Sequence, residues 1–246
     1  MKNNFYSIKP FKKIFAQPNT KSEVISDLLY GEKFKILLKK GKWIKIKTMF
    51  DNYTGYIKND YHMSFFKPDL KTFKLSSQIF KKKKGKFYKT KNFITFGSKI
   101  ENIRTEKNFI EFEKNKWLKS SDLKKLNHKI KNYKKLFKIF LNVKYKWGGK
   151  NFTGIDCSGL IQLFYYYNNN FCPRDTKDQL PFFKKKTGKI NKIKKDIIFW
   201  KGHVAISLNK NKLIHAYGPE KRVLIMNKRK TFDRIFKDTK LKPIFL

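Results

Sequence analysis

Apolar and basic residues alternate over much of the first 66 positions, a period of two that is typical of half-buried strands. The clearest case is EKFKILLKKGKWIKIKT, in which two alternating runs flank Gly41 and so predict a hairpin. DNYTGYIKNDYH follows, with Asn52 and Gly55 as turn residues. We therefore expect residues 1–66 to form a small all-β domain.

Residues 67–126 repeat this pattern more weakly. Pro68 breaks the chain, KKKKGK is typical of a solvated turn, and the stretch that ends at Trp117 and Leu118 alternates again. These features predict a second small all-β domain.

The period changes in residues 127–246. Apolar residues recur three and four positions apart in two segments, which predicts one buried face on each of two helices. These residues are Ile130, Tyr133, Leu136, Phe137, Phe140 and Leu141 in the first segment, and Leu160, Ile161, Leu163, Phe164 and Tyr167 in the second. Four apolar runs follow, DIIFW, HVAISL, KLIHAY and RVLIM, and are expected to form an antiparallel meander. The prediction for this part is an α+β domain.

Charge changes this picture less than its size suggests. The chain carries 60 Lys and Arg against 18 Asp and Glu, a net charge of +42, which would attract a polyanion such as nucleic acid, anionic lipid or an acidic substrate. Lys, Asn, Ile, Phe and Tyr all have A/T-only codons and are all abundant, so nucleotide bias explains much of the charge without a polyanion. We expect no dedicated nucleic-acid partner.

Two further observations bear on the cellular compartment. The chain contains no window of 18 apolar residues, and its first 20 residues lack an apolar run of signal-peptide length. Its two cysteines, Cys157 and Cys172, do not make a disulfide framework. Both observations favour a cytoplasmic protein without a membrane span.

Cys157 is the first candidate for chemistry. In GIDCSGLIQLFYYY it follows Asp156, a good N-cap, and would begin the second helix. The partial positive charge at a helix N-terminus lowers the pKa of a thiol, and Gly159 leaves room for another element to approach the sulfur. A small buried hydrophobe at a helix start would give the same pattern, so the cysteine alone does not decide the question.

Two of the four histidines would supply a base. His203 and His215 lie twelve residues apart on two predicted strands, a spacing that a hairpin brings side by side. His203 shares its strand face with small residues, which favours a cleft over a packed core; satisfied structural histidines are the alternative. His62 and His128 are interpreted as surface residues. No close Cys or His pair of the kind used by zinc sites occurs, so we expect neither a metal nor another cofactor.

Five motifs occur in the order YKWGGKNFTGIDCSGLIQ, PRDTKDQ, DIIFW, GHVAISL and LIHA. Together they resemble the NlpC/P60 cysteine peptidases, over about residues 130–246. The resemblance implies a papain-like α+β fold with a Cys-His-His triad, in which Cys157 is the nucleophile, His203 the base and His215 the residue that orients it. Tyr145 corresponds to a tyrosine near the oxyanion in that family.

The first 66 residues resemble bacterial SH3-like (SH3b) domains through the YGE turn and the strands that contain GKW and GYI. Two such domains before an NlpC/P60 domain resemble the γ-D-glutamyl-L-diamino acid endopeptidases of murein recycling. The resemblance implies hydrolysis of the amide between D-Glu and the diamino acid in murein peptides with a free N-terminal L-Ala. The candidate substrate contacts are Asp156, Ser158, Trp147, Arg174, Asp175, Thr176, Glu23 and Tyr53.

Several roles stay open in the sequence. Asp156 could cap the helix, bind the substrate's amine, or do both, and Arg174 could bind a substrate carboxylate or stabilise its loop. The alternative enzyme is an exported hydrolase that acts on intact peptidoglycan. The alternative without catalysis is an inactive SH3-type protein that binds wall fragments or nucleic acid.

Overall fold

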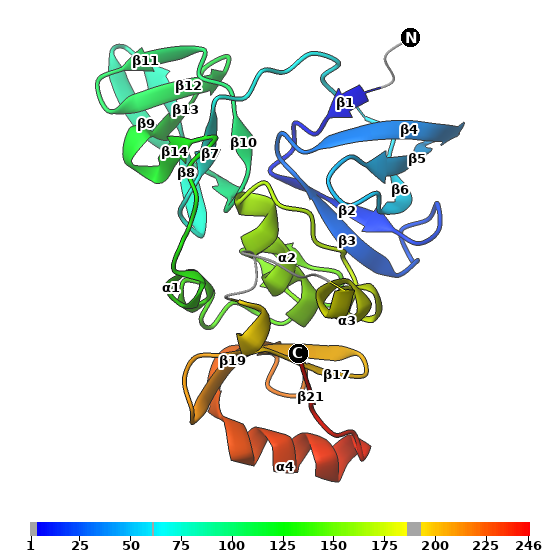
Figure 1. Ribbon diagram of the computed structural model, residues 1–246. Coiled ribbons are helices and arrows are strands. Elements are labelled where there is room, and N and C mark those ends of the chain that lie inside the picture. The colour runs from blue at the N-terminus through cyan, green and yellow to red at the C-terminus, as the bar shows by residue number, and fades with distance from the viewer. Residues whose placement is uncertain (1–3, 61, 186–192) are drawn as a thin grey trace. The chain divides into compact units, whose positions relative to one another are not determined.

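The computed structural model describes residues 4–60, 62–185 and 193–246 and divides the chain into two compact units, 1–128 and 129–246. The first unit consists of strands and one short 3₁₀ helix, Ser120–Asp122, whereas the second combines helices with one main sheet (Figure 1). The α+β class with an all-β N-terminal part is therefore confirmed.

The first part of unit 1 is an antiparallel sheet of six strands in the order β1-β4-β5-β6-β2-β3. The strands are β1 (Asn4–Tyr6), β2 (Phe11–Phe15), β3 (Val24–Leu29), β4 (Lys33–Lys40), β5 (Trp43–Thr48) and β6 (Thr54–Lys58). The predicted hairpin joins β4 to β5 through the pair Lys40 and Trp43, and Gly41 supplies the positive φ of 55° that its turn requires. Burial alternates along β5, where Ile44 and Ile46 point into the core, which is why the period of two predicts this strand.

The second part of unit 1 contains a sheet of three strands, β10-β7-β14, and a sheet of five, β11-β12-β13-β8-β9. The strands are β7 (Leu70–Thr72), β8 (Ser76–Lys83), β9 (Lys86–Thr95), β10 (Lys99–Ile100), β11 (Arg104–Glu106), β12 (Phe109–Glu113), β13 (Lys116–Lys119) and β14 (Leu123–Lys125). The KKKKGK segment forms the turn of the β8–β9 hairpin, where Lys84 and Gly85 both have positive φ.

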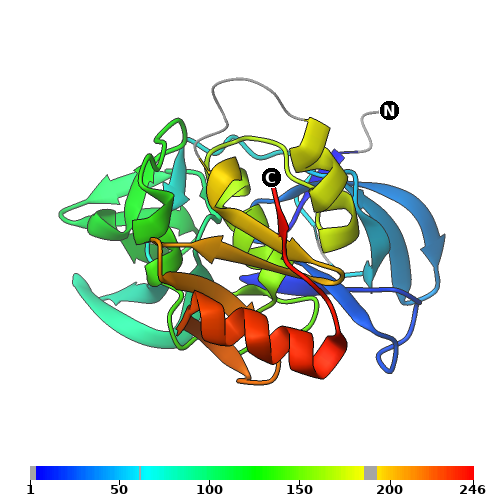
Figure 2. The same ribbon diagram turned by 60° about the horizontal axis from the view of Figure 1, so that its bottom comes forward.

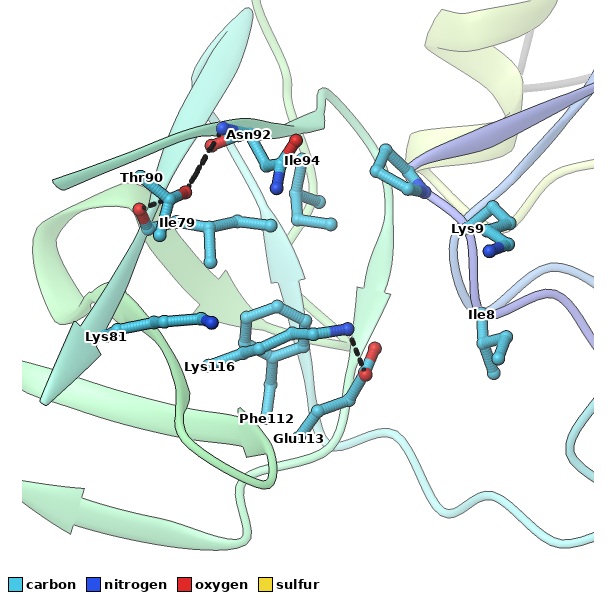
Figure 3. Close-up of a pocket in the computed structure, with 11 residues that line it drawn as sticks. Ile8, Lys9, Ile79, Lys81, Thr90, Asn92, Ile94, Phe112, Glu113 and Lys116 are labelled. Atoms are coloured by element: carbon cyan, nitrogen blue, oxygen red, sulfur yellow. Dashed lines mark hydrogen bonds and ion pairs between the residues drawn. The ribbon is translucent and has the colours of Figure 1, made fainter.

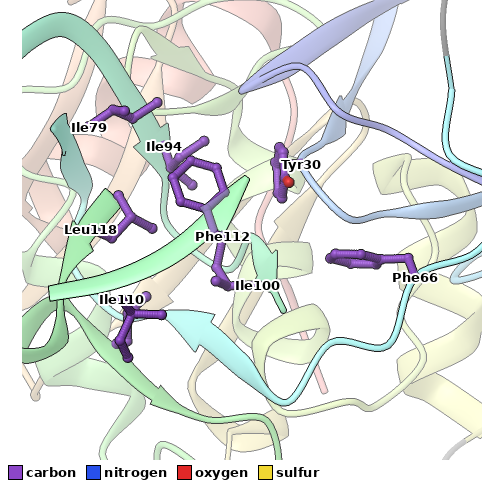
Figure 4. Close-up of a cluster of buried hydrophobic side chains, with 9 residues drawn as sticks. Tyr30, Phe66, Ile79, Ile94, Ile100, Ile110, Phe112 and Leu118 are labelled. Carbon is purple, nitrogen blue, oxygen red and sulfur yellow. The ribbon is translucent and has the colours of Figure 1, made fainter. Parts of the chain in front are cut away.

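One apolar core joins the two parts of unit 1. Tyr30, from the YGE turn, and Phe66, from the connection between the parts, are buried among side chains of the second part (Figure 4). The Tyr30 ring meets the Phe112 ring edge to face, with centroids 5.4 Å apart. A Cβ on Gly31 would lie 2.4 Å from the Lys99 carbonyl oxygen, so glycine is needed at this close approach.

His62 is not a surface residue, so that interpretation was wrong. Its side chain is 7% exposed, and its ring meets the rings of Phe34 and Phe5 edge to face, at 5.3 and 6.1 Å. Burial lowers the pKa of His62. The apolar partners come from β1 and β4, distant in sequence, so the polar neighbours of His62 in the chain gave no sign of them.

Unit 2 is built on a five-stranded antiparallel sheet in the order β20-β19-β18-β17-β21. Its elements are α1 (Tyr133–Lys138), β15 (Lys150–Asn151), β16 (Gly154–Ile155), α2 (Cys157–Tyr167), α3 (Thr176–Lys185), the 3₁₀ helix η3 (Lys194–Asp196), β17 (Ile197–Trp200), β18 (His203–Ser207), β19 (Lys212–Tyr217), β20 (Arg222–Asn227), α4 (Lys228–Thr239) and β21 (Ile244–Phe245). Helix α2 packs against β18 and β19 and helix α4 against β20, on opposite faces of the sheet (Figures 1 and 2).

The strands and α2 agree with the predicted helix and meander, and three helices differ. The first predicted helix is confined to Tyr133–Lys138. Helices α3 and α4 lie in segments for which no helix was predicted. Both bury only two residues, Gln179 and Phe183 in α3 and Thr231 and Ile235 in α4, so their apolar stripes are too narrow to stand out.

Candidate active site

Helix α2 begins at Cys157 because Asp156 caps it. The backbone of Asp156 is extended, and its carboxylate accepts the backbone N–H of Gly159 at 2.7 Å. Gly159 lets the preceding loop approach the helix, since a Cβ there would lie 2.6 Å from the carbonyl oxygen of Gly149. The glycines therefore bring the WGG loop against the first turn of α2.

The Asp156 carboxylate is saturated by partners inside unit 2. Arg174 donates two hydrogen bonds to it, from Nη2 to Oδ2 at 2.6 Å and from Nη1 to Oδ1 at 3.0 Å. The backbone N–H of Gly148 and the hydroxyl of Ser158 also donate, at 2.9 and 3.2 Å. The Arg174 and Asp156 side chains are only 1% and 6% exposed. This ion pair fixes the loop before α2 to the PRD loop, and a contact of Arg174 with substrate stays a prediction.

Gln179 is a further link between these segments. Its amide nitrogen donates to the carbonyl oxygens of Ser158, at 3.0 Å, and Pro173, at 2.9 Å. It holds the first turn of α2 against the loop that enters α3. The only signal in the sequence was its place at the end of the PRDTKDQ motif.

The Cys157 thiol is buried and neutral. Cys157 is 4% exposed, and its sulfur accepts hydrogen bonds from the backbone N–H groups of Val204 in β18 and of Ser158. Burial, followed by the neighbouring Asp156 carboxylate, raises the pKa of the thiol to about 12. The backbone N–H groups lower this pKa, as predicted for the start of a helix, but desolvation outweighs them and the net shift is upward.

His203 and His215 are brought together as the strand spacing predicts. Strands β18 and β19 are antiparallel neighbours, and His203 Nε2 lies 2.9 Å from His215 Nδ1. His215 is completely buried, whereas His203 is partly exposed. Burial lowers the pKa of His203 to about 4 and the pKa of His215 well below its usual value, so both imidazoles are neutral at pH 7.

The face of the sheet that carries the histidines is aromatic rather than open. The His203 ring lies 5.6 Å from that of Trp200, and the His215 ring stacks on Tyr217 at 4.6 Å and 11°. Phe232 of α4 covers Trp200. Only part of His203 reaches solvent, which differs from the expectation of a face lined by small residues.

The thiol and the imidazole are close but not hydrogen-bonded. Val204, whose N–H acts on the Cys157 sulfur, is the residue after His203. Within the described ranges, no hydrogen bond joins the Cys157 thiol to the His203 ring. Catalytic hydrogen bonds are often long without substrate and tighten in the substrate complex.

Comparison with known proteins decides the family of this unit. Residues 142–237 match the NlpC/P60 family, and residues 13–62 match the bacterial SH3 domain. Residues 142–237 form an NlpC/P60 domain. The NlpC/P60 family is one of cysteine peptidases, so the resemblance seen in the motifs is confirmed.

Three known proteins align with most of this chain. The chain is 25% identical over 228 residues to dipeptidyl-peptidase 6 of Lysinibacillus sphaericus, which covers 82% of this chain and 83% of the relative. An NlpC/P60 family protein from Bacillus cereus has the same fold, with a TM-score of 0.73 and 16% identity over 91% of this chain and 94% of that one. An NlpC/P60 endopeptidase from Photobacterium damselae subsp. piscicida aligns with a TM-score of 0.66 and 13% identity, over 98% of this chain and 70% of that one.

Tyr145 of the NlpC/P60 domain lies near the thiol. Its backbone N–H donates to the Lys221 carbonyl at 2.7 Å, and its ring passes Gly218, where a Cβ would lie 3.6 Å from it. Burial, then the charges of Cys157 and Asp156, raises the pKa of Tyr145, so its hydroxyl keeps its proton and can donate a hydrogen bond. This is the property that an oxyanion ligand requires.

The other predicted contacts fall in two places. In the NlpC/P60 domain, Trp147 is 59% exposed, Asp175 accepts at its carbonyl the first hydrogen bonds of α3, and Thr176 begins α3. Glu23 and Tyr53 lie in unit 1, immediately before β3 and β6. Their part in substrate binding stays a prediction.

Among the described residues, no group of three or more His, Cys, Asp and Glu could hold a metal ion, and no helix is long and apolar enough to cross a membrane. A pocket of about 290 Å³ in unit 1 has an apolar floor that includes Phe112 and a rim with Lys9, Lys81 and Lys116 (Figure 3). Three of its eleven lining residues are lysines, close to the share of basic residues in the whole chain, 60 of 246, so the rim identifies no ligand.

Proposed function

We propose that this protein hydrolyses the γ-D-glutamyl–diamino acid amide bond of murein peptides that carry a free N-terminal L-Ala, and that it acts in cell-wall recycling in the cytoplasm. One observation carries the chemistry: a cysteine begins α2 beside the strand that bears His203, whose ring is hydrogen-bonded to His215. The relative named dipeptidyl-peptidase 6, which aligns over most of the chain, supports this substrate class.

The mechanism begins from neutral groups. His203 uses Nε2 to contact His215, which leaves Nδ1 as the nitrogen that takes the Cys157 proton. The thiolate attacks the amide carbonyl carbon, and the oxyanion is stabilised by the Cys157 backbone N–H and the Tyr145 hydroxyl. His203 then protonates the leaving amine, and water hydrolyses the acyl-enzyme.

Asp156 has a structural duty that limits its part in substrate binding. Five donor groups already surround its two oxygens, including both terminal nitrogens of Arg174. A substrate ammonium group would have to share these oxygens. We therefore assign Asp156 first to the cap and the ion pair, and amine binding by Asp156 is a secondary contribution.

A substrate panel tests the proposal. The full chain is incubated with L-Ala-γ-D-Glu-diaminopimelate, with the lysine peptide, with the N-acetylated peptide and with intact peptidoglycan, and release of products is followed by mass spectrometry. We expect cleavage of the free-amine peptides only. Equal cleavage of the N-acetylated peptide would contradict the free-amine requirement, and release from intact wall alone would favour an exported hydrolase.

A matched pair of cysteine variants tests the nucleophile. Cys157→Ala should abolish hydrolysis, while Cys172→Ala should retain it. Both residues are buried free cysteines, so both variants lose similar packing and only the first loses the thiol next to β18. Activity that survives in Cys157→Ala would contradict the mechanism. If the wild-type protein cleaves neither the peptides nor intact peptidoglycan, the result would favour a binding protein.

A further inference from the structure

The far side of His215 meets a thioether. His215 Nε2 lies 3.3 Å from Sδ of Met226 in β20. Strands β19 and β20 place Leu224 directly opposite His215, so Met226 is its diagonal neighbour on the same face. The second nitrogen of the orienting histidine is therefore not in water and faces one weak acceptor.

A thioether distinguishes the two tautomers of a neutral imidazole. Sulfur in Met accepts a hydrogen bond and has none to donate, so it binds His215 only when Nε2 carries the proton. In that tautomer Nδ1 is a lone pair, and His203 must donate to it from Nε2. His203 Nδ1 is then unprotonated and able to act as base.

The other tautomer would disable the site. With its proton on Nδ1, His215 would donate to His203 Nε2, and the neutral His203 would carry its proton on Nδ1, where no base remains for the thiol. His215 Nε2 would also turn a lone pair toward the Met226 sulfur. The backbone and the packing allow both tautomers of His215, so the acceptor at Nε2 determines which tautomer is favoured.

The surroundings keep His215 uncharged, which makes its tautomer matter. Tyr217 stacks on its ring. The Arg234 guanidinium lies over the Tyr217 ring, 5.4 Å from its centroid, and is paired with Glu220 at 2.6 Å. Burial, His203 and Arg234 all lower the pKa of His215. A protonated His215 would donate from both nitrogens and need no selection.

We infer that Met226 is a positioning residue of the NlpC/P60 site: its thioether accepts the Nε2–H of His215 and thereby fixes the tautomers of both histidines so that His203 Nδ1 is the base. The inference rests on the proposed function for its kinetic part. Its structural part, the position of a proton, does not require any substrate.

Two-bond ¹H–¹⁵N spectra of the full chain test the proton position. We expect His215 Nε2 to be protonated in wild type, and Met226→Leu, which keeps the volume but removes the acceptor, to populate the Nδ1–H form. In the same variant kcat should fall about threefold to tenfold with KM unchanged, the effect of one weak hydrogen bond. Met226→Gln, which offers a carbonyl oxygen, should restore the Nε2–H form and most of kcat.

Met63→Leu makes the same exchange in the core of unit 1 and controls for packing, with unchanged spectra and kcat expected. Circular dichroism confirms that each variant is folded, and Met226→Gln keeps the test available if Met226→Leu unfolds. An unprotonated His215 Nε2 in wild type, or an unchanged tautomer in Met226→Leu, would overturn the inference. If the wild-type protein cleaves no murein peptide, the proposed function is contradicted, and the spectra still test whether Met226 fixes the tautomer of His215.

Discussion

Removing the guanidinium of Arg174 should lower the free energy of unfolding of the NlpC/P60 domain, and not only weaken substrate binding. Arg174→Ala leaves the Asp156 carboxylate buried without its counter-charge, and it also removes donors to Ser158 Oγ at 2.9 Å and to the Gly149 carbonyl. Breaking a buried ion pair from one side costs about 3–5 kcal/mol. Three other donors remain on Asp156, two backbone N–H groups and the Ser158 hydroxyl, so we expect the lower end, about 3 kcal/mol.

Urea unfolding of the full chain, followed by circular dichroism and tryptophan fluorescence, measures this loss. In a unit of this size about 3 kcal/mol corresponds to a fall in melting temperature of roughly 10 °C. Arg222→Ala is the matched control, because Arg222 is exposed and makes a single bond of 3.3 Å to Asn142; its effect should stay within about 0.5 kcal/mol. A loss below about 1 kcal/mol in Arg174→Ala together with a raised KM would refute the structural role and favour a substrate carboxylate ligand.

Other predictions concern the thiol, the base and the loop around them. Because the pKa of Cys157 is raised to about 12, alkylation of this thiol by iodoacetamide should be slow at pH 7 and accelerate steeply above pH 10. The pKa of His203 falls to about 4 on folding, so the unfolded chain binds the proton at a higher pH than the folded chain does. The neutral ring therefore contributes about 3 kcal/mol to the free energy of unfolding above pH 6.5, and this contribution is lost as the pH falls through 4. Urea unfolding at a series of pH values measures it. Gly159→Ala should reduce both stability and activity, because the new Cβ meets the backbone oxygen of Gly149; an active, stable variant would contradict the close packing. Tyr145→Phe should lower kcat about a hundredfold at unchanged fold, and an unaltered kcat would exclude its hydroxyl from the oxyanion site.

The elements with a strong local period were predictable. β5 alternates buried and half-buried residues, and α2 has both an N-cap and an apolar face, so sequence spacing alone predicts them. α3 and α4 were missed because each buries only two residues. The insertion of Tyr30 into the core of the second part of unit 1 was also not predictable, because that contact depends on a residue 82 positions away, Phe112.

Which residues could do chemistry is evident from the sequence. A cysteine after an N-cap and two histidines at hairpin spacing are local features, and local backbone geometry carries them into the fold unchanged. The tertiary structure decided what state those residues are in. Burial raises the pKa of Cys157 and lowers that of His203, Arg174 takes up the Asp156 carboxylate, and Met226 faces His215. Desolvation and pairing depend on groups that the fold brings from distant segments, so residue spacing along the chain does not predict them.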